Sequence, residues 1–297
     1  MSDTNYNYNT IILNKNNIVS GSKNSVFKYT FNQSLRLNDC SLAIQSINMY
    51  YSWFNISDYF RNNKFSYVWF DNAGDLNTTI DITIPDGFYT VELLNKFLQS
   101  ELEKRGHYLI QQSTGDFAYH IEFISNVSYY SVQLNVYAMM TAAQAGTDFV
   151  KGSETWSYPS TPTTPQLVVS NSSSSFGDLI GYSNGSYPST ASSTNTTFLS
   201  DKTPNMTPVS SINVVCSMTT QNGFSNPDGL LYSFTSGSVE FGGMIDREPK
   251  TESFVKVRDA LYSSFTIELY DQDMRRLDIR DAETVIMLII KSPTNED

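Results

Sequence analysis

Five carboxylates lie close together near the C-terminal end of the chain: Asp271, Asp273, Asp278, Asp281 and Glu283. Carboxylates at this density can bind Ca²⁺, and two of them separated by about 5–9.5 Å can hydrolyse a glycosidic bond. Three arginines are interleaved with them, however, and the segment lacks the spacing and the glycine of an EF-hand loop. We therefore interpret 271–283 as a salt-bridged surface turn and expect neither a metal site nor a catalytic site there.

The two histidines and the two cysteines do not form a recognisable reactive centre. His107 follows a helix-like segment, His120 lies in a strand-like one, and the spacing of Cys40 and Cys216 does not fit a zinc site. The sequence also lacks the serine elbow of hydrolases and the glycine-rich loop that binds phosphates. We predict no catalytic residue and no cofactor, and we expect both cysteines to be free, buried thiols.

Three tryptophans could provide an aromatic platform for a carbohydrate. Trp53 and Trp69 lie in apolar, strand-like segments, where packing in the core or between subunits is the better interpretation. Trp156 lies in a polar loop and is the one candidate for an exposed contact.

The composition favours an all-β protein. Charged residues make up 16% of the 297 residues, and the chain contains 19 tyrosines and 18 phenylalanines, which favour strands. The net charge of −11 argues against binding to nucleic acid, which needs clustered lysines and arginines. The N-terminal segment has no basic region followed by an apolar stretch, so we expect no signal peptide.

Alternating apolar residues predict strands along most of the chain. In 78–85, for example, Ile80, Ile82 and Ile84 face one way, and polar residues face the other. Segment 284–291 is continuously apolar, which is typical of a strand buried on both faces. The other predicted strands are 25–31, 41–54, 64–70, 107–113, 117–125, 129–137, 210–218, 230–234, 238–243 and 262–271.

One amphipathic helix interrupts this pattern near 90–105. Thr90 is suited to the N-cap, and Gly106 is suited to end the helix. Its apolar residues, Val91, Leu94, Phe97 or Leu98, and Leu102, fall on one stripe. Such a helix can cover one face or edge of a sheet but cannot form a core alone.

Region 138–208 differs in composition, because it is rich in Ser, Thr and Asn and lacks regular periodicity. We interpret it as a loop-rich insertion, anchored at the apolar islands 166–171 and 176–182, that could form an upper subdomain. The predicted fold is an antiparallel β-sandwich, a single jelly roll, with one covering helix and long loops. The predicted organisation is an N-terminal arm, 1–24, followed by one jelly-roll domain, 25–297.

Four segments, taken in order, resemble the penton (vertex) proteins of virophages and Polinton-type DNA viruses. In that family, an element of the form DG-aromatic-[ST]-x-x-x-LN follows an early strand of a single jelly roll. The matching residues here are Asp86, Gly87, Tyr89, Leu94 and Asn95.

The other three segments are shorter matches. Segment 50–69 contributes Trp53 and Asn55, although Phe54 stands where the family has proline. Segment 176–182 contributes Gly181, and the closing strand pair, 254–291, contributes Asp271. The resemblance covers about 40–137 and 176–291 and is absent over roughly 140–175.

The resemblance implies a structural protein that forms homopentamers at the fivefold vertices of an icosahedral DNA virus. Its partners would be other copies of itself and the major capsid protein, its location the virion, and its place of assembly the infected host cell. The loops of 138–208 could contact a host receptor or glycan. Two alternatives stay open: a fibre-head or carbohydrate-binding module with an exposed cluster of Trp156, Tyr158 and Tyr187, and, less favoured, a hydrolase that uses the carboxylates of 271–283.

Overall fold

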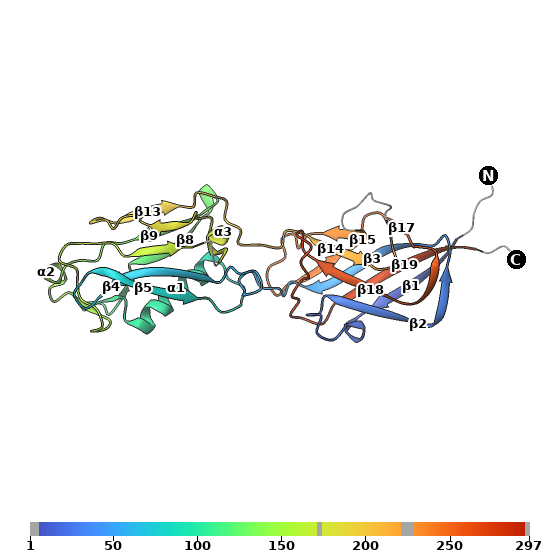
Figure 1. Ribbon diagram of the computed structural model, residues 1–297, viewed down its shortest axis with the longest axis horizontal. Coiled ribbons are helices and arrows are strands. Elements are labelled where there is room, and N and C mark those ends of the chain that lie inside the picture. The colour runs from blue at the N-terminus through green and yellow to red at the C-terminus, as the bar shows by residue number, and fades with distance from the viewer. Residues whose placement is uncertain (1–5, 171–173, 221–227, 295–297) are drawn as a thin grey trace. The chain divides into compact units, whose positions relative to one another are not determined.

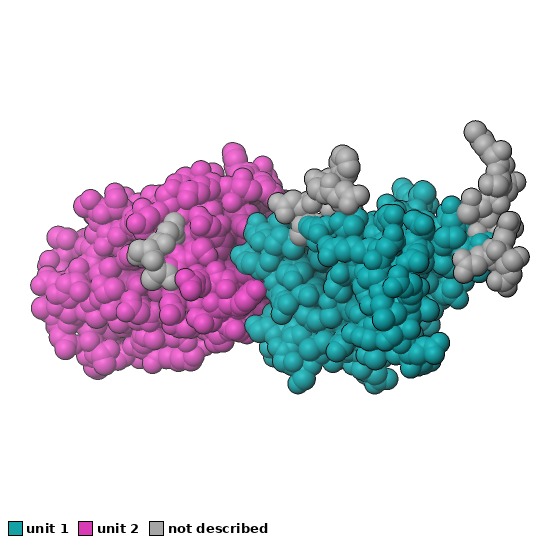
Figure 2. Space-filling view, turned by 45° about the vertical axis from the view of Figure 1, so that its right-hand side comes forward, with its two compact units in different colours: residues 1–53, 209–297 teal, residues 54–208 magenta. Residues whose placement is uncertain are grey.

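The computed structural model describes residues 6–170, 174–220 and 228–294 and divides the chain into two compact units. Residues 1–53 and 209–297 form one unit, and residues 54–208 form the other (Figure 2). We call the first the jelly-roll unit and the second the inserted unit. Residues 1–5 of the expected N-terminal arm and 171–173 of the expected insertion lie outside the described residues. None of the described helices has the length and hydropathy needed to span a bilayer.

The jelly-roll unit contains two antiparallel sheets (Figure 1). The first sheet has the order β1-β19-β3-β16, and the short β17 also pairs with β3. The second sheet has the order β15-β14-β18-β2. The strands span Tyr6–Leu13 (β1), Val26–Leu37 (β2), Ser41–Tyr50 (β3), Ile212–Cys216 (β14), Leu230–Phe234 (β15), Met244–Arg247 (β16), Val255–Lys256 (β17), Ala260–Tyr270 (β18) and Val285–Pro293 (β19).

The order in which the chain visits these sheets is that of a single jelly roll. β1, β2 and β3 lie in the first, second and first sheets in turn, and β14 and β15 lie in the second. β16, β18 and β19 then return to the first, second and first sheets. Eight principal strands in two four-stranded layers with this connectivity confirm the predicted all-β jelly roll.

Buried and partly exposed side chains alternate along the strands, so each sheet of the sandwich turns one face to the shared core. On β18, Phe265, Ile267 and Leu269 are buried, while the intervening residues are only partly buried. β19 follows the same rule, since Ile286 and Leu288 are buried and their neighbours are partly exposed. The prediction that 284–291 is buried on both faces is therefore wrong within one chain, because only one face of its sheet meets the core.

The inserted unit connects β3 to β14 and carries a second core. Its sheets have the orders β12-β11-β4-β5, β13-β9-β8 and β10-β6-β7. Its strands span Lys64–Phe70 (β4), Leu76–Thr83 (β5), Leu109–Gln111 (β6), Phe117–Ala118 (β7), Ile121–Asn126 (β8), Ser131–Val136 (β9), Phe149–Lys151 (β10), Gln166–Val169 (β11), Gly185–Tyr187 (β12) and Thr196–Leu199 (β13). The helices are α1 (Val91–Arg105), α2 (Ala142–Ala145) and α3 (Phe176–Ile180).

Helix α1 has the predicted bounds and caps. The Thr90 side chain accepts a hydrogen bond from Leu93 N, and Gly106 ends the helix with φ +67°. Its buried stripe is Val91, Leu94, Leu98 and Leu102. The stripe packs in the core of the inserted unit, where α1 contacts β8, whereas we expected the helix to cover the jelly roll.

Other local expectations differ from the structure. The compact inserted unit begins at Phe54 and not at 138, so it contains most of the strands predicted in 64–137. The N-terminal arm contains β1, which pairs with β19 along its full length. Segment 238–243 forms turns that precede β16, since its glycines favour turns over a strand.

Candidate interaction surfaces

The carboxylates of the acidic segment 271–283 form ion pairs with nearby basic residues. No group of three or more His, Cys, Asp or Glu in residues 6–170, 174–220 and 228–294 could hold a metal ion. The Arg275 guanidinium contacts the carboxylates of Asp271 and Asp273 at 2.8 Å each, and Lys23 contacts Asp278 at 2.6 Å. The salt-bridged interpretation of this turn is confirmed.

Asp271 carries the buried carboxylate of that turn. Its Oδ1 atom accepts hydrogen bonds from the backbone N–H groups of Asp273 and Arg275, both at 2.9 Å. The carboxylate therefore fixes the path of the chain between β18 and β19, and the observed contacts are those of a structural residue.

The two histidines both pack against one tryptophan in the inserted unit. The His107 ring stacks on Trp69 with 4.8 Å between ring centroids, and the His120 ring lies 6.3 Å from Trp69 at a steep angle. Burial lowers the pKa of each histidine to about 4, so both are neutral at pH 7. The Tyr67 hydroxyl lies 2.8 Å from His107 Nδ1, and His120 Nδ1 lies 3.1 Å from the carbonyl oxygen of Tyr137.

Three of the residues that carry the family resemblance, Asn55, Gly87 and Tyr89, meet near the beginning of the inserted unit. The Asn55 amide nitrogen donates to the carbonyl oxygens of Tyr89 and Met206, and Asn55 Oδ1 accepts from Tyr89 N, each at 2.8 Å. Ile56 and Gly87 exchange two backbone hydrogen bonds, of 3.1 and 2.9 Å. A Cβ atom on Gly87 would lie 2.8 Å from the Tyr89 ring, so only glycine fits without rearrangement. These hydrogen bonds join the aspartate-glycine-aromatic element to Asn55. We call Asn55, Ile56, Gly87 and Tyr89 the Asn55 cluster.

The remaining motif residues also lie in structural positions. Asp86 Oδ1 accepts from Asp58 N at 2.9 Å, and Asn95 Oδ1 accepts from the backbone of β8 at 2.9 Å. Leu94, on α1, is fully buried. Gly181 has φ +79° and faces a backbone carbonyl oxygen. Trp53, in the jelly-roll unit, is buried against the Tyr51 ring, with 4.4 Å between centroids.

Trp156 is buried, which contradicts the expectation that it is an exposed contact. It is 1% exposed, and its indole N–H donates to the carbonyl oxygen of Gly106 at 2.8 Å. Tyr158 and Tyr187, which the carbohydrate-binding alternative placed beside it on the surface, pack against the same core. The polar composition of the loop suggested exposure, but the loop places its one large apolar side chain in the core.

Among the described residues, the two aromatic side chains with the largest exposed fractions lie instead at the turn between β8 and β9. Val127 is 84% exposed, Tyr129 is 71% exposed and Tyr130 is 74% exposed. Val127 and Tyr130 also line a cavity of about 330 Å³ whose other described lining residues carry no charge. Sequence reasoning missed this surface because 129–137 fits a strand, although "NVSYYS" at the junction is a signal for a turn.

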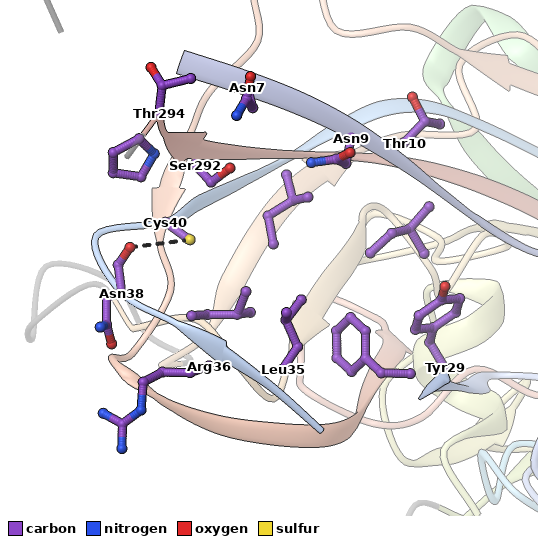
Figure 3. Close-up of a pocket in the computed structure, with 15 residues that line it drawn as sticks. Asn7, Asn9, Thr10, Tyr29, Leu35, Arg36, Asn38, Cys40, Ser292 and Thr294 are labelled. Carbon is purple, nitrogen blue, oxygen red and sulfur yellow. Dashed lines mark hydrogen bonds between the residues drawn. The ribbon is translucent and has the colours of Figure 1, made fainter. Parts of the chain in front are cut away.

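In the jelly-roll unit, a groove of about 910 Å³ lies between β1 and the second half of β2 (Figure 3). Asn7 and Asn9 project from β1, and Leu35 projects from β2. Arg36 is the single charged residue among the described residues that line it. The Cys40 thiol donates to the Asn38 carbonyl oxygen at 3.3 Å, and burial raises the pKa of Cys40.

Both cysteines are buried and free, as predicted. Burial raises the pKa of Cys216 to about 11, so this thiol is protonated at neutral pH and is a poor nucleophile.

No protein-family model and no curated protein matches the chain. Among solved structures, it is similar to the mavirus penton protein, with a TM-score of 0.46 and 9% identity over 98% of this chain and 100% of that chain. It is also similar to a chain in the electron cryo-microscopy structure of the Sputnik virophage, with a TM-score of 0.38 and 12% identity over 98% of each chain.

Proposed function

We propose that this chain is a structural capsid protein whose copies form homopentamers at the fivefold vertices of an icosahedral DNA virus. The observation that carries the proposal is the set of contacts within the Asn55 cluster. The sequence motif of the penton family corresponds here to residues that contact one another, and the same element continues into α1 through Leu94 and Asn95. If the motif matched by chance, we would not expect its residues and Asn55 to be joined by hydrogen bonds in the structure.

The arrangement of the chain supports the same proposal. The jelly roll is complete without the inserted unit, since all eight of its principal strands lie in residues 1–53 and 209–297. We infer that the jelly roll builds the capsid contacts and that the upper subdomain comprises 54–208, and not 138–208 alone.

The proposed partners are other copies of this chain and the major capsid protein of the same virion. The net charge of −11 does not favour direct contact with the viral nucleic acid. The proposed location is the virion, after assembly in the infected host cell. A capsid role of this kind needs no cofactor and no catalytic residue.

Antibody labelling of virus particles tests the proposal directly. Fab fragments raised against residues 54–208 would be bound to particles that contain this chain, and the particles would be imaged by electron cryo-microscopy. We expect Fab density at the fivefold vertices. Density distributed over the facets would contradict a vertex role but would agree with another capsid role.

A second candidate function is attachment to a host glycan or receptor through the inserted unit. It is favoured by the exposure of Tyr129 and Tyr130 beside an uncharged cavity, since tyrosine rings can stack on sugars and their hydroxyl groups can form hydrogen bonds. Binding to a glycan array that is lost in Tyr129→Ser and Tyr130→Ser variants would support this function. A wild-type protein that binds no glycan would contradict glycan recognition.

A further inference from the structure

The two sheets of the jelly-roll unit differ in the faces that they turn away from their shared core. On the first sheet, the residues opposite the buried positions of β1 and β19 include Ile12, Val285, Met287 and Ile289. The strand register places Ile12 directly opposite Met287. Ile12 is 51% exposed, and the three β19 residues are partly exposed. We call these four residues the apolar face.

Opposite the buried positions Phe265, Ile267 and Leu269, the second sheet has polar residues. Its central strand β18 presents Ser264, Thr266 and Glu268, and the edge strand β2 presents Lys28 opposite Thr266. This face follows the ordinary rule for antiparallel sheets, in which one face packs on the core and the other is polar and solvated. The apolar face breaks that rule.

The sequence of β19 indicates that its second face is also buried in the functional protein. "VIMLII" is the continuous apolar run of a strand covered on both sides, but within one chain only Ile286, Leu288 and Ile290 are buried. A contiguous exposed apolar patch on a soluble protein commonly marks a surface that contacts another molecule.

Charge favours a second copy of the same chain as that molecule. Each copy carries a net charge of −11, so copies repel each other least where they meet through surfaces with few exposed acidic groups. The four residues of the apolar face are uncharged. The exposed carboxylate in register with Val285, that of Asp246 on the edge strand β16, accepts a hydrogen bond from Asn48 at 2.8 Å. The adjacent Lys291 places its ammonium group 3.8 Å from the centroid of the Tyr6 ring, so the nearest charge on β19 is positive and lies over an aromatic ring.

We propose that the apolar face is the surface through which one jelly-roll unit contacts the next copy of this chain. The inference rests on the proposed homopentamer. A closed ring of five has a heterologous interface, so the apolar face of one copy meets a different surface of its neighbour, and each copy uses it once.

Charge substitutions on the two sheets test this inference. Met287→Glu places a carboxylate at the centre of the apolar face, and Thr266→Glu places one on the central strand of the other sheet, opposite Lys28. Ile12→Glu, on an exposed position of the edge strand β1, guards against a folding defect that is specific to β19. Circular dichroism and thermal unfolding of each variant would establish that it is folded.

The readout is the dissociation constant of the oligomer, measured on the full-length chain by sedimentation velocity over a concentration series. We expect Met287→Glu and Ile12→Glu to raise it at least tenfold, and Thr266→Glu to leave it within twofold of wild type. A wild-type pentamer that both apolar-face variants still form with unchanged affinity would overturn the inference while leaving the pentamer itself intact. A wild-type chain that is monomeric at every concentration would also overturn it, whereas Fab labelling of particles tests the vertex role separately.

Discussion

The two units of this chain build their cores in different ways. The jelly-roll unit buries mostly aliphatic residues, such as Leu13, Ile47 and Leu288, which alternate regularly along its strands. The inserted unit contains the four largest fully buried side chains of the described residues: Trp69, Trp156, Tyr67 and Tyr182. It also contains both histidines of the chain.

This difference teaches that the two units depend on different interactions. The first is specified by strand alternation, which tolerates volume-conserving exchanges of aliphatic residues. The second depends on aromatic rings with polar atoms, and these need defined hydrogen-bond partners when buried. Trp156 and Tyr182 find backbone carbonyl oxygens, whereas Trp69 Nε1 and His120 Nε2 are without a hydrogen-bond partner within the described part of the chain.

Acid should destabilise the inserted unit far more than the jelly-roll unit, and this is the largest expected effect. The folded-state pKa values of His107 and His120 are lowered from 6.5 to about 4. Between these values the unfolded chain binds protons that the folded chain does not, so stability is lost as the pH falls from 6.5 to 4. The loss is about 3 kcal/mol for each histidine. Hydrogen exchange at pH 7 and pH 4.5 would locate it in 54–208.

The matched control for the acid prediction is a chain with His107→Gln and His120→Gln. It keeps every carboxylate of the wild type, so the difference in pH dependence between the two chains isolates the histidines. An equally steep loss of stability in both chains between pH 6.5 and pH 4 would contradict the assignment.

Removing the Asn55 side chain should be the next largest perturbation. Asn55→Ala leaves three partly buried backbone groups, two on Tyr89 and one on Met206, without their hydrogen-bond partner. We expect a loss of about 3 kcal/mol in the free energy of unfolding of the inserted unit, measured by denaturant titration. Asn48→Ala is the control in the jelly-roll unit, since Asn48 contacts Asp246 at the surface, and it should cost less than about 0.5 kcal/mol. A loss for Asn55→Ala as small as the one expected for Asn48→Ala would show that the Asn55 cluster contributes little to stability.

Two glycines with similar φ angles allow the cost of a positive φ to be measured separately from the cost of a steric clash at Cβ. Gly181 in the inserted unit has φ +79°, and a Cβ atom there would lie 2.4 Å from the backbone oxygen of Lys202. Gly21 in the jelly-roll unit has φ +77° and open space around it. We expect Gly181→Ala to cost about 2–3 kcal/mol and Gly21→Ala about 1 kcal/mol, with thermal unfolding as the measurement. A larger loss for Gly21→Ala would contradict the packing described for Gly181.

The smallest predicted effect concerns the cap of α1. Thr90→Ala removes the hydrogen bond to Leu93 N, of 3.2 Å, and should cost about 1 kcal/mol. Thr90→Ser keeps the hydroxyl group and should stay close to wild type. Amide exchange at Leu93, measured by nuclear magnetic resonance, would detect the difference, and equal protection in the two variants would exclude the cap.

The contrast between the units also explains how much of the fold could be predicted from sequence. Helix α1 and strands such as β5 and β18 were predicted because their apolar residues recur at helical or strand spacing. The boundary at Phe54 could not be predicted, because β4 and β5 have the same alternation as the strands of the jelly roll. Alternation shows that a strand has a buried face but not which core that face joins.

For the candidate surfaces, the sequence correctly predicted contacts between residues that are close in the chain. It did not predict which side chains are buried, because burial depends on residues that are distant in the chain. The arginines interleaved with Asp271 and Asp273 indicated ion pairs, which the structure contains. The burial of Trp156 depends on Gly106, a residue far away in the sequence, which accepts its hydrogen bond. The apolar face was present in the sequence of β19 but was interpreted as burial within one chain.

Native mass spectrometry of the purified, full-length chain tests the central claim most directly, because it counts the subunits of the assembly. Our account predicts a species with five times the 33.5 kDa mass of one chain, and class averages of the same sample with fivefold symmetry. A stable trimer would contradict the account and would favour a fibre-head module instead.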